Sequence, residues 1–167
     1  MSELLLTYRG MVYPWQCDHM GHMNVMWYAG KFDEASWQLL ARLGLTRRYM
    51  LERGSVLAAV QQNTSYKHEL RAGDIITIRS GVIQVREKVI RFLHEMRNDE
   101  TGAISSATDV TVVSMDREMR RACSFPSDFL KRVRQHIADH GRIDPEEIHD
   151  TLPQATFSSA SSIPRPS

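Results

Sequence analysis

Apolar residues recur at helical spacing after Asn24, and this stretch constrains the fold more than any other part of the sequence. Asn24 stands where a helix N-cap is expected, and Gly44 stands where a helix ends. A long helix with one apolar side must pack against a large surface. The residues that share this side are Val25, Tyr28, Ala29, Phe32, Ala35, Leu39, Leu40 and Leu43.

The sequence after this helix predicts such a surface. A short second helix is expected between Thr46 and Gly54. β-rich runs separated by turn residues then occupy 55–70, 75–97 and 103–115. Strands joined by tight turns pair antiparallel, so we expect an antiparallel sheet with the long helix covering its apolar face. Alternation is clearest at Ile90, Phe92, His94 and Met96, which would share one face.

Two further elements complete the expected order. Residues 7–17 are aromatic and β-branched with Pro14 near their end, which predicts a first, edge strand. A C-terminal helix should begin at Pro126 or Ser127. The sequence thus predicts an α+β fold.

The chain length suits one domain, which we place at 1–149. Residues 150–167 hold three of the six prolines and five serines, a composition typical of a mobile tail.

Composition excludes several classes of function. Lysine and arginine number 21 against 20 acidic residues, so the net charge is only +1 and does not indicate attraction to nucleic acid or to an acidic membrane. Stretches of 18 apolar residues are absent, and the apolar start of the chain lacks a basic flank. The two cysteines, Cys17 and Cys123, form no disulfide framework, so we expect reduced thiols and a cytoplasmic protein.

Reactive side chains gather in one place, residues 16–32, immediately before and within the start of the long helix. A helix N-terminus offers unpaired N–H groups and partial positive charge, which can hold the oxygen of a reacting carbonyl. Asp18 lies in the loop that leads to that end, where it could act as nucleophile or as general base for water. An Asp that only satisfies turn amides is the commoner structural role.

The pattern D-x-x-G-H-x-N-x-x-x-Y, formed by Asp18, Gly21, His22, Asn24 and Tyr28, resembles the hotdog-fold acyl-CoA thioesterases of the 4-hydroxybenzoyl-CoA thioesterase branch. The acidic pair at 33–34 and the turn RAGD at 71–74 extend the resemblance, which runs from about residue 5 to residue 135.

The resemblance implies a long central helix wrapped by a curved antiparallel sheet. It also implies a homodimer, or a dimer of dimers, with active sites at the dimer interface. Asp18 corresponds to the acidic residue of the family, and the amides near Asn24 and Val25 correspond to its helix N-terminus. His22 could orient Asp18 or the substrate, or serve as a structural hydrogen-bonding residue.

Acyl-CoA is the expected partner, and we expect basic side chains to bind its phosphates. Lys67 and Arg71, near the RAGD turn, are our candidates among many solvated charges. Glu34 on the helix is a second candidate acid and ranks below Asp18. His19 and His22 lack further ligands at readable spacing, so we expect no metal and no cofactor.

A narrower resemblance links residues 13–28 to thioesterases of carnitine and betaine metabolism, which would imply a betaine-type acyl-CoA. Aromatic rings bind quaternary ammonium groups, and five aromatic residues lie in or beside this region: Tyr13, Trp15, Trp27, Tyr28 and Trp37. The alternative is that these rings are core and interface packing.

The expected function is hydrolysis of a small or medium acyl-CoA. A hotdog hydratase or dehydratase that leaves the thioester intact is a second interpretation, and an acyl-CoA-binding dimer without chemistry is a third. The sequence does not identify the acyl group.

Overall fold

The computed structural model describes residues 4–140. Its elements in chain order are β1 (Leu5–Met11), a 3₁₀ turn (Pro14–Gln16), α1 (Val25–Arg42), α2 (Arg47–Glu52), β2 (Ser55–Tyr66), β3 (Ile75–Val85), β4 (Val89–Asn98), β5 (Ile104–Asp116) and α3 (Ser127–His140). The predicted tail at 150–167 lies outside the described residues. Within the described part, no helix is both long and apolar enough to cross a membrane.

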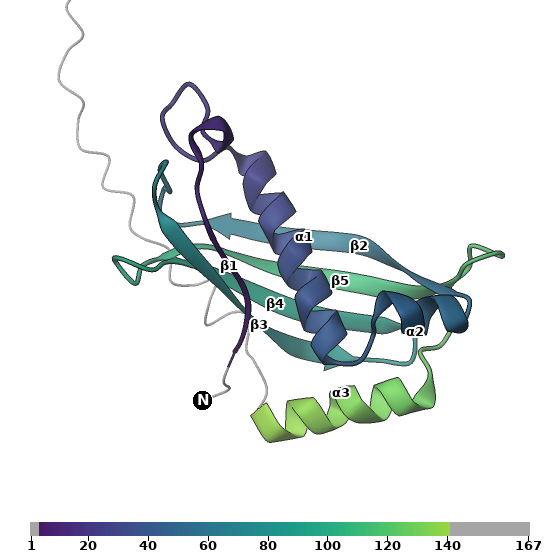
Figure 1. The fold of residues 1–167 in the computed structure, drawn as a ribbon. Coiled ribbons are helices and arrows are strands. Elements are labelled where there is room, and N and C mark those ends of the chain that lie inside the picture. The colour runs from purple at the N-terminus through teal and green to yellow at the C-terminus, as the bar shows by residue number, and fades with distance from the viewer. Residues whose placement is uncertain (1–3, 141–167) are drawn as a thin grey trace, which may run out of the picture.

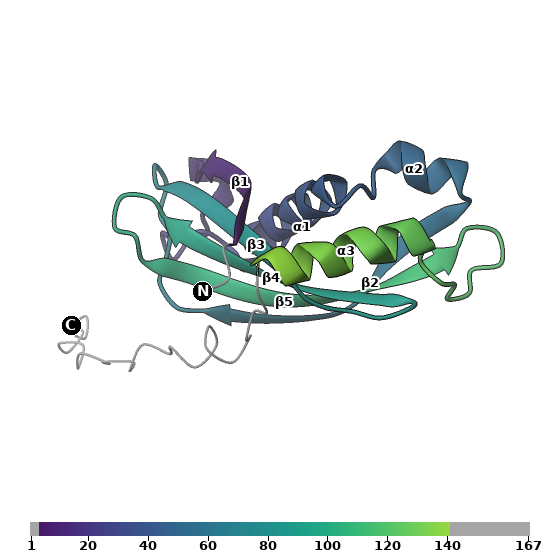
Figure 2. The same cartoon turned by 90° about the horizontal axis from the view of Figure 1, so that it is seen from below.

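The five strands form one antiparallel sheet in the order β1-β3-β4-β5-β2. β1 and β2 are therefore its two edges. α1 runs across one face of this sheet (Figure 1), and α3 lies on the same side (Figure 2). This is the predicted α+β arrangement of a central helix, an antiparallel sheet and a C-terminal helix.

The long helix begins and ends as its sequence predicts. The Asn24 side chain accepts a hydrogen bond from the Met26 amide, and Gly44 adopts a φ of +88° just after the last turn. Phe32, Ala35 and Leu39 are buried against the sheet. Burial of this apolar side fixes both the position of α1 and that of the loop before it.

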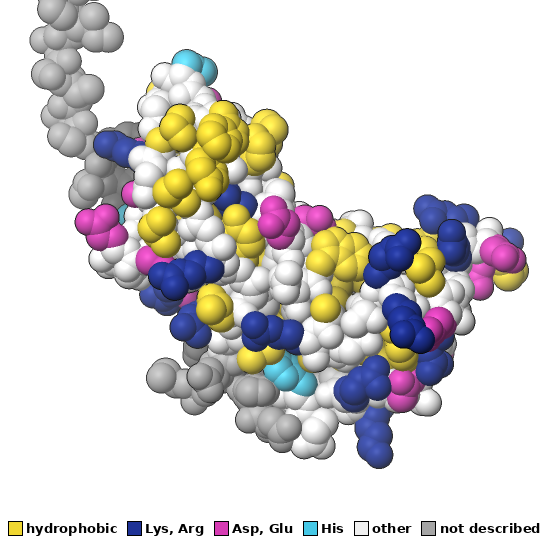
Figure 3. Space-filling view, in the orientation of Figure 1, with side chains coloured by type: hydrophobic (Ala, Val, Ile, Leu, Met, Phe, Trp, Pro, Cys, Tyr) yellow, Lys and Arg dark blue, Asp and Glu magenta, His cyan; other side chains and the backbone are white. Residues whose placement is uncertain are grey.

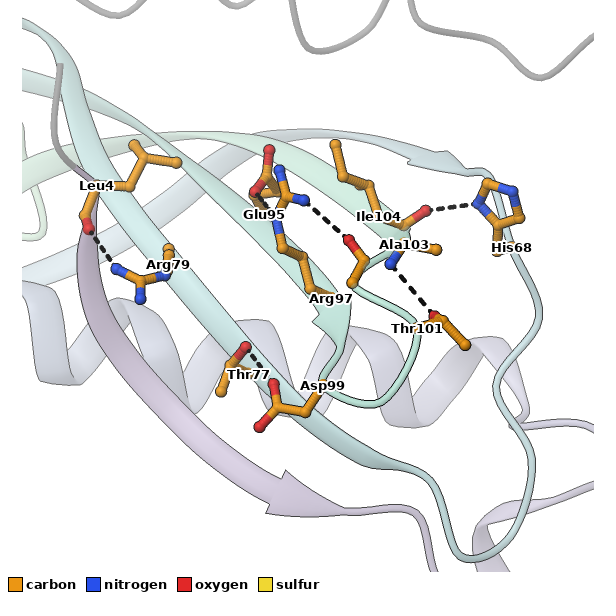
Figure 4. A network of polar contacts seen from close by, with 11 residues as sticks. Leu4, His68, Thr77, Arg79, Glu95, Arg97, Asp99, Thr101, Ala103 and Ile104 are labelled. Carbon is orange, nitrogen blue, oxygen red and sulfur yellow. Dashed lines mark hydrogen bonds and ion pairs between the residues drawn. The ribbon is translucent and has the colours of Figure 1, made fainter. Parts of the chain in front are cut away.

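Side chains of the sheet alternate between an inner face buried under α1 and an outer face that carries polar residues and a small apolar cluster of Ile83 and Leu93. Ile90, Phe92, His94 and Met96 are each 0% exposed, which confirms their predicted common face. On the outer face, the Thr77 hydroxyl donates to Asp99 at 2.8 Å (Figure 4). The inner face is thus committed to the core beneath α1.

A buried lysine ties α1 to the β1 edge. Lys31 is 4% exposed, and its ammonium group donates to the Tyr8 hydroxyl at 3.1 Å and to the Met11 carbonyl at 3.4 Å. The Tyr8 ring also lies under this cation, with 5.3 Å from Nζ to the ring centroid.

Two strand predictions differ from the structure. The first strand ends at Met11 rather than near residue 17, because Pro14 has no N–H to donate and begins a 3₁₀ turn instead. The run 75–97 comprises two strands, since residues 86–88 form a turn in which the Arg86 amide donates to the Val89 carbonyl at 2.7 Å.

Candidate active site

The loop before α1 is a compact turn closed by its own backbone. The Asp18 amide donates to the His22 carbonyl at 3.1 Å, and the Gly21 amide donates to the Asp18 carbonyl at 3.0 Å. Gly21 has a φ of +82°, a conformation that glycine adopts without steric cost. Cys17 and Met23 pair as an antiparallel bridge at its base. The turn holds Asp18 close to the start of the helix.

The Asp18 carboxylate accepts two hydrogen bonds. The Met20 amide donates to one oxygen at 2.9 Å, and the Asn24 side-chain amide donates to the other at 3.2 Å. The Met20 bond is the main cause of a pKa for Asp18 below its ordinary value; partial desolvation opposes this shift and the Asn24 bond adds to it. Asp18 is therefore a carboxylate at neutral pH, the form that a nucleophile or general base requires.

The first turn of α1 leaves one backbone donor free. The Asn24 amide donates to Gln16, the Met26 amide to the Asn24 side chain and the Trp27 amide to the Asn24 carbonyl. The Val25 amide has no acceptor among the described residues, and the Val25 side chain is 59% exposed. Asn24 therefore holds the Asp18 carboxylate through its side chain and directly precedes Val25, the residue whose amide has no acceptor.

Residues 69–71, which are distant from this loop in the sequence, lie against it in the fold. The Met23 amide donates to the Leu70 carbonyl at 2.7 Å, which fixes residues 69–71 against the loop. His22 Nε2 lies 3.9 Å from a Glu69 carboxylate oxygen, and Arg71 lies 3.8 Å from the other oxygen. The structure therefore places His22 and Arg71 on the same carboxylate, an exposed arrangement that sequence reasoning missed because Glu69 carried no motif.

Lys67 lies a little further along the same segment. Its backbone amide donates to the Ser105 carbonyl at 2.7 Å, so its backbone is fixed to β5. It is half-buried, whereas Arg71 is exposed.

The three aromatic candidates lie in different settings. Trp15 is 68% exposed and stacks on Tyr13, with ring centroids 4.4 Å apart. Trp27 is half-buried against the core. Tyr28 is 4% exposed, its hydroxyl lies 3.3 Å from the Ser105 hydroxyl, and burial raises its pKa. Only Trp15 offers an open ring surface beside the loop.

Hydrophobic side chains gather on the surface over this loop and the first turn of α1 (Figure 3). Trp15, Met20, Val25 and Met26 are each more than half exposed there. An apolar surface around a carboxylate and a free amide suits an acyl group, or a partner subunit, better than water.

A cavity of about 210 Å³ lies further along α1, between that helix and strands β2 and β5. The helix contributes Phe32, Asp33, Ser36 and Trp37 among others, and the strands contribute mainly apolar residues. Sequence reasoning missed this site, although the spacing of Asp33 and Trp37 already places both on one side of a helix. Glu34, the second candidate acid, instead borders a hollow beside β1 together with Tyr8 and Arg42.

Within the described residues, no group of three or more histidine, cysteine or acidic side chains is arranged to hold a metal. The chemistry available at the loop is therefore that of an ionised carboxylate next to a free backbone donor. This pair can attack, or direct water to, a carbonyl whose oxygen is held by the amide.

Comparison with known proteins identifies the family of the chain. A family model described as the thioesterase-like superfamily matches residues 12–133. The chain belongs to this superfamily. The match spans the loop, α1 and strands β2 to β5, and it confirms the resemblance found in the sequence.

The individual relatives of this chain are distant in sequence. A betainyl-CoA thioesterase of Pseudomonas aeruginosa is 23% identical over 133 residues, which cover 80% of this chain and 84% of that protein. A Staphylococcus aureus protein solved in complex with CoA covers 98% of both chains, with a TM-score of 0.79 and 21% identity. A 1,4-dihydroxy-2-naphthoyl-CoA thioesterase of Synechocystis has a TM-score of 0.70 and 17% identity, and covers 81% of this chain and 98% of its own. These structures establish the hotdog fold.

Proposed function

We propose that the protein is an acyl-CoA thioesterase whose reaction centre is the Asp18 carboxylate and the Val25 amide. The observation that carries the proposal is the hydrogen bond from Asn24 to Asp18, because it places an ionised carboxylate next to the helix-start amide that has no acceptor among residues 4–140. Membership of the thioesterase-like superfamily supports the reaction class.

Hydrolysis requires a nucleophile at the thioester carbonyl and a donor for its oxygen. Asp18 attacks the carbonyl directly to give an anhydride that water then cleaves, or it takes a proton from water that adds to the carbonyl. On either route the carbon–sulfur bond breaks and CoA leaves as a thiolate. The Val25 amide donates a hydrogen bond to the oxygen on which negative charge develops, and the partial positive charge of the helix N-terminus adds to this stabilisation.

The remaining candidates bind and position. His22 orients Asp18 or substrate, Trp15 and Trp27 contact the acyl or pantetheine portion, and Lys67 and Arg71 meet the CoA phosphates. Tyr28 supports the first turn of α1 from the core, since it is buried and its hydroxyl already contacts Ser105. The site is completed by a second copy of the chain.

The direct test measures CoA release from a panel of acyl-CoAs with a thiol reagent. We expect hydrolysis of at least one small or medium acyl-CoA, and a loss of at least about a hundredfold in kcat for Asp18→Asn. The substitution keeps an acceptor for the Met20 amide, so folding should persist, as thermal unfolding will verify.

Asp116→Asn is the matched control. Asp116 also accepts backbone amides in a turn, from Glu118 at 2.9 Å and Met119 at 2.7 Å, but it lies at the end of β5. Its activity should equal that of wild type. Full activity in Asp18→Asn would assign Asp18 to loop structure, and absence of CoA release across the panel would reject thioester hydrolysis.

A further inference from the structure

The cavity between α1, β2 and β5 has an unusual charge pattern. Its walls are mostly apolar, and Asp33 is the one charged side chain among the described residues that line it. Asp33 has no ion-pair partner within residues 4–140. Because Asp33 is an exposed residue, it places a single negative charge at the open edge of the cavity.

An aromatic ring stands beside this carboxylate. Asp33 and Trp37 are four residues apart on α1, so their side chains lie on the same side of the helix. Trp37 is 45% exposed and lines the same cavity, and Phe32 forms part of its floor. In Figure 3 hydrophobic side chains also appear beside α1, on the side that faces β2 and β5, with acidic side chains nearby.

The carboxylate, the indole ring and the apolar wall together determine which charge and which surface polarity a ligand of this cavity needs. An anionic group would be repelled by Asp33, and a neutral apolar group would desolvate the carboxylate without compensation. A quaternary ammonium offers a positive charge for the carboxylate, methyl groups for the apolar wall and a cation for the indole face. The volume of about 210 Å³ is below the range of about 300–1,000 Å³ typical of sites for drug-sized ligands, so it suits a compact head group.

We propose that this cavity binds a quaternary ammonium group at the end of the acyl chain, held by the Asp33 carboxylate and the Trp37 indole. The inference rests on the proposed thioesterase function and names the class of acyl group. Among the aromatic residues that the sequence offers for cation binding it selects Trp37, because Tyr28 lies in the core and Trp15 stacks on Tyr13.

The test compares ligands that differ only in charge. The first pair is 4-(trimethylammonio)butanoyl-CoA and its neutral match, 5,5-dimethylhexanoyl-CoA, for hydrolysis. The second pair consists of the corresponding thioethers, which carry no carbonyl and report binding by calorimetry whether or not the protein is an enzyme. For both pairs we expect wild type to favour the cationic member by about tenfold or more, in kcat/KM and in Kd.

Variants assign this preference to the cavity. Asp33→Asn keeps the shape and removes the charge, so the two thioethers should bind within about twofold of each other. Trp37→Leu should also reduce the preference. Glu34→Gln removes a neighbouring charge that borders the hollow beside β1 instead, and it should keep the wild-type ratio of binding constants.

Failure of this inference is separable from failure of the proposed function. Equal binding of the two thioethers, or a preference that survives in Asp33→Asn, overturns the inference even if neutral acyl-CoAs are hydrolysed. A charge preference that Asp33→Asn abolishes, together with no hydrolysis of any thioester, upholds the cavity assignment and rejects the thioesterase proposal.

Discussion

At the scale of single residues, His94 is the most constrained titratable group of the core. It is 0% exposed, with one ring nitrogen 2.8 Å from the Ser36 hydroxyl and the other 2.5 Å from the Ser80 hydroxyl. Ser80 in turn lies 2.5 Å from the Thr7 hydroxyl. The Ser36 hydroxyl donates to the Phe32 carbonyl at 2.8 Å, so it accepts from His94 Nε2–H, and the Ser80 hydroxyl can donate to the unprotonated Nδ1. These contacts satisfy a neutral imidazole. Burial lowers the pKa of His94 to about 3.

The buried histidine predicts a pH dependence of stability. An unfolded histidine binds a proton near pH 6.5, whereas folded His94 stays neutral down to about pH 3. The unfolded state therefore binds more protons in this window, and the free energy of unfolding should fall by up to about 1.4 kcal/mol per pH unit as pH decreases. Urea unfolding of wild type and His94→Asn between pH 7.5 and 4.5 measures this slope. The variant should be less stable at pH 7.5 and should have a shallower slope.

His19→Asn is the control for this experiment, because it removes an exposed loop histidine and leaves the buried hydroxyl chain intact. Asp18 and Asp128, whose pKa values are lowered by hydrogen bonds, are present in both proteins, so their contribution cancels from the difference between the two slopes. Parallel stability curves for wild type and His94→Asn would show that His94 does not cause the slope.

The sequence predicted the local environment of some residues but not the contacts that others make across the fold. The cap at Asn24 and the turn at Gly21 were readable because both depend on a few neighbouring residues. The setting of Asp33 was not, since its surroundings come from β2 and β5, which meet α1 only in the folded chain. The partnership of His22 with Glu69 was hidden for the same reason.

At the scale of elements, α1 connects the two proposed sites. Its first amide, at Val25, belongs to the reaction centre, and Asp33 lies further along the same rigid element. A helix rises about 1.5 Å per residue, so Asp33 lies about 12 Å along the axis from Val25. The Asp33 side chain leans back toward the N-terminus, which shortens the gap that a ligand must span.

This spacing predicts which cationic acyl chain fits best. After allowance for the side chain and for contact distances, about 6 Å remains between the carbonyl at Val25 and the cation near Asp33. A single methylene is too short for that span, and three or four methylenes suit it. The ratio of kcat/KM for cationic over neutral isosteric substrates should therefore be larger for 4-(trimethylammonio)butanoyl-CoA than for trimethylammonioacetyl-CoA.

The neutral matches, 5,5-dimethylhexanoyl-CoA and 3,3-dimethylbutanoyl-CoA, remove any general effect of chain length from this comparison. Asp33→Asn should bring both ratios close to one. A larger ratio for the single-methylene pair would mean that the reacting carbonyl does not lie at the Val25 amide of the same chain.

At the scale of the whole molecule, the layers were the most predictable feature. The helical spacing of 25–43 and the alternation at 90–96 both predicted burial of one side, and most of these residues are buried. Val25 and Ala29 are exceptions, because both lie exposed near the start of α1. The ends of strands were less predictable, because Pro14 and residues 86–88 break the chain where composition alone still favours a strand. The order of strands, which leaves β2 as an edge, required the fold itself.

That edge predicts how two chains associate. Residues 59–63 of β2 are exposed, and Val60, at an irregularity in the β2–β5 pairing, is 59% exposed. β2 pairs only with β5 within the described residues, so its outer backbone groups can pair with a second copy.

We expect light scattering to give twice the mass of one chain for wild type. Val60→Asp places a charge on the edge and should shift the protein toward monomer, with kcat/KM reduced about tenfold or more if the partner completes the site. Met119→Asp, at an apolar residue 66% exposed in the turn after β5, is the matched control and should remain a dimer with wild-type activity. A monomeric Val60→Asp protein with full activity would show that one chain contains the whole site, and a monomeric wild type would exclude edge-to-edge pairing altogether.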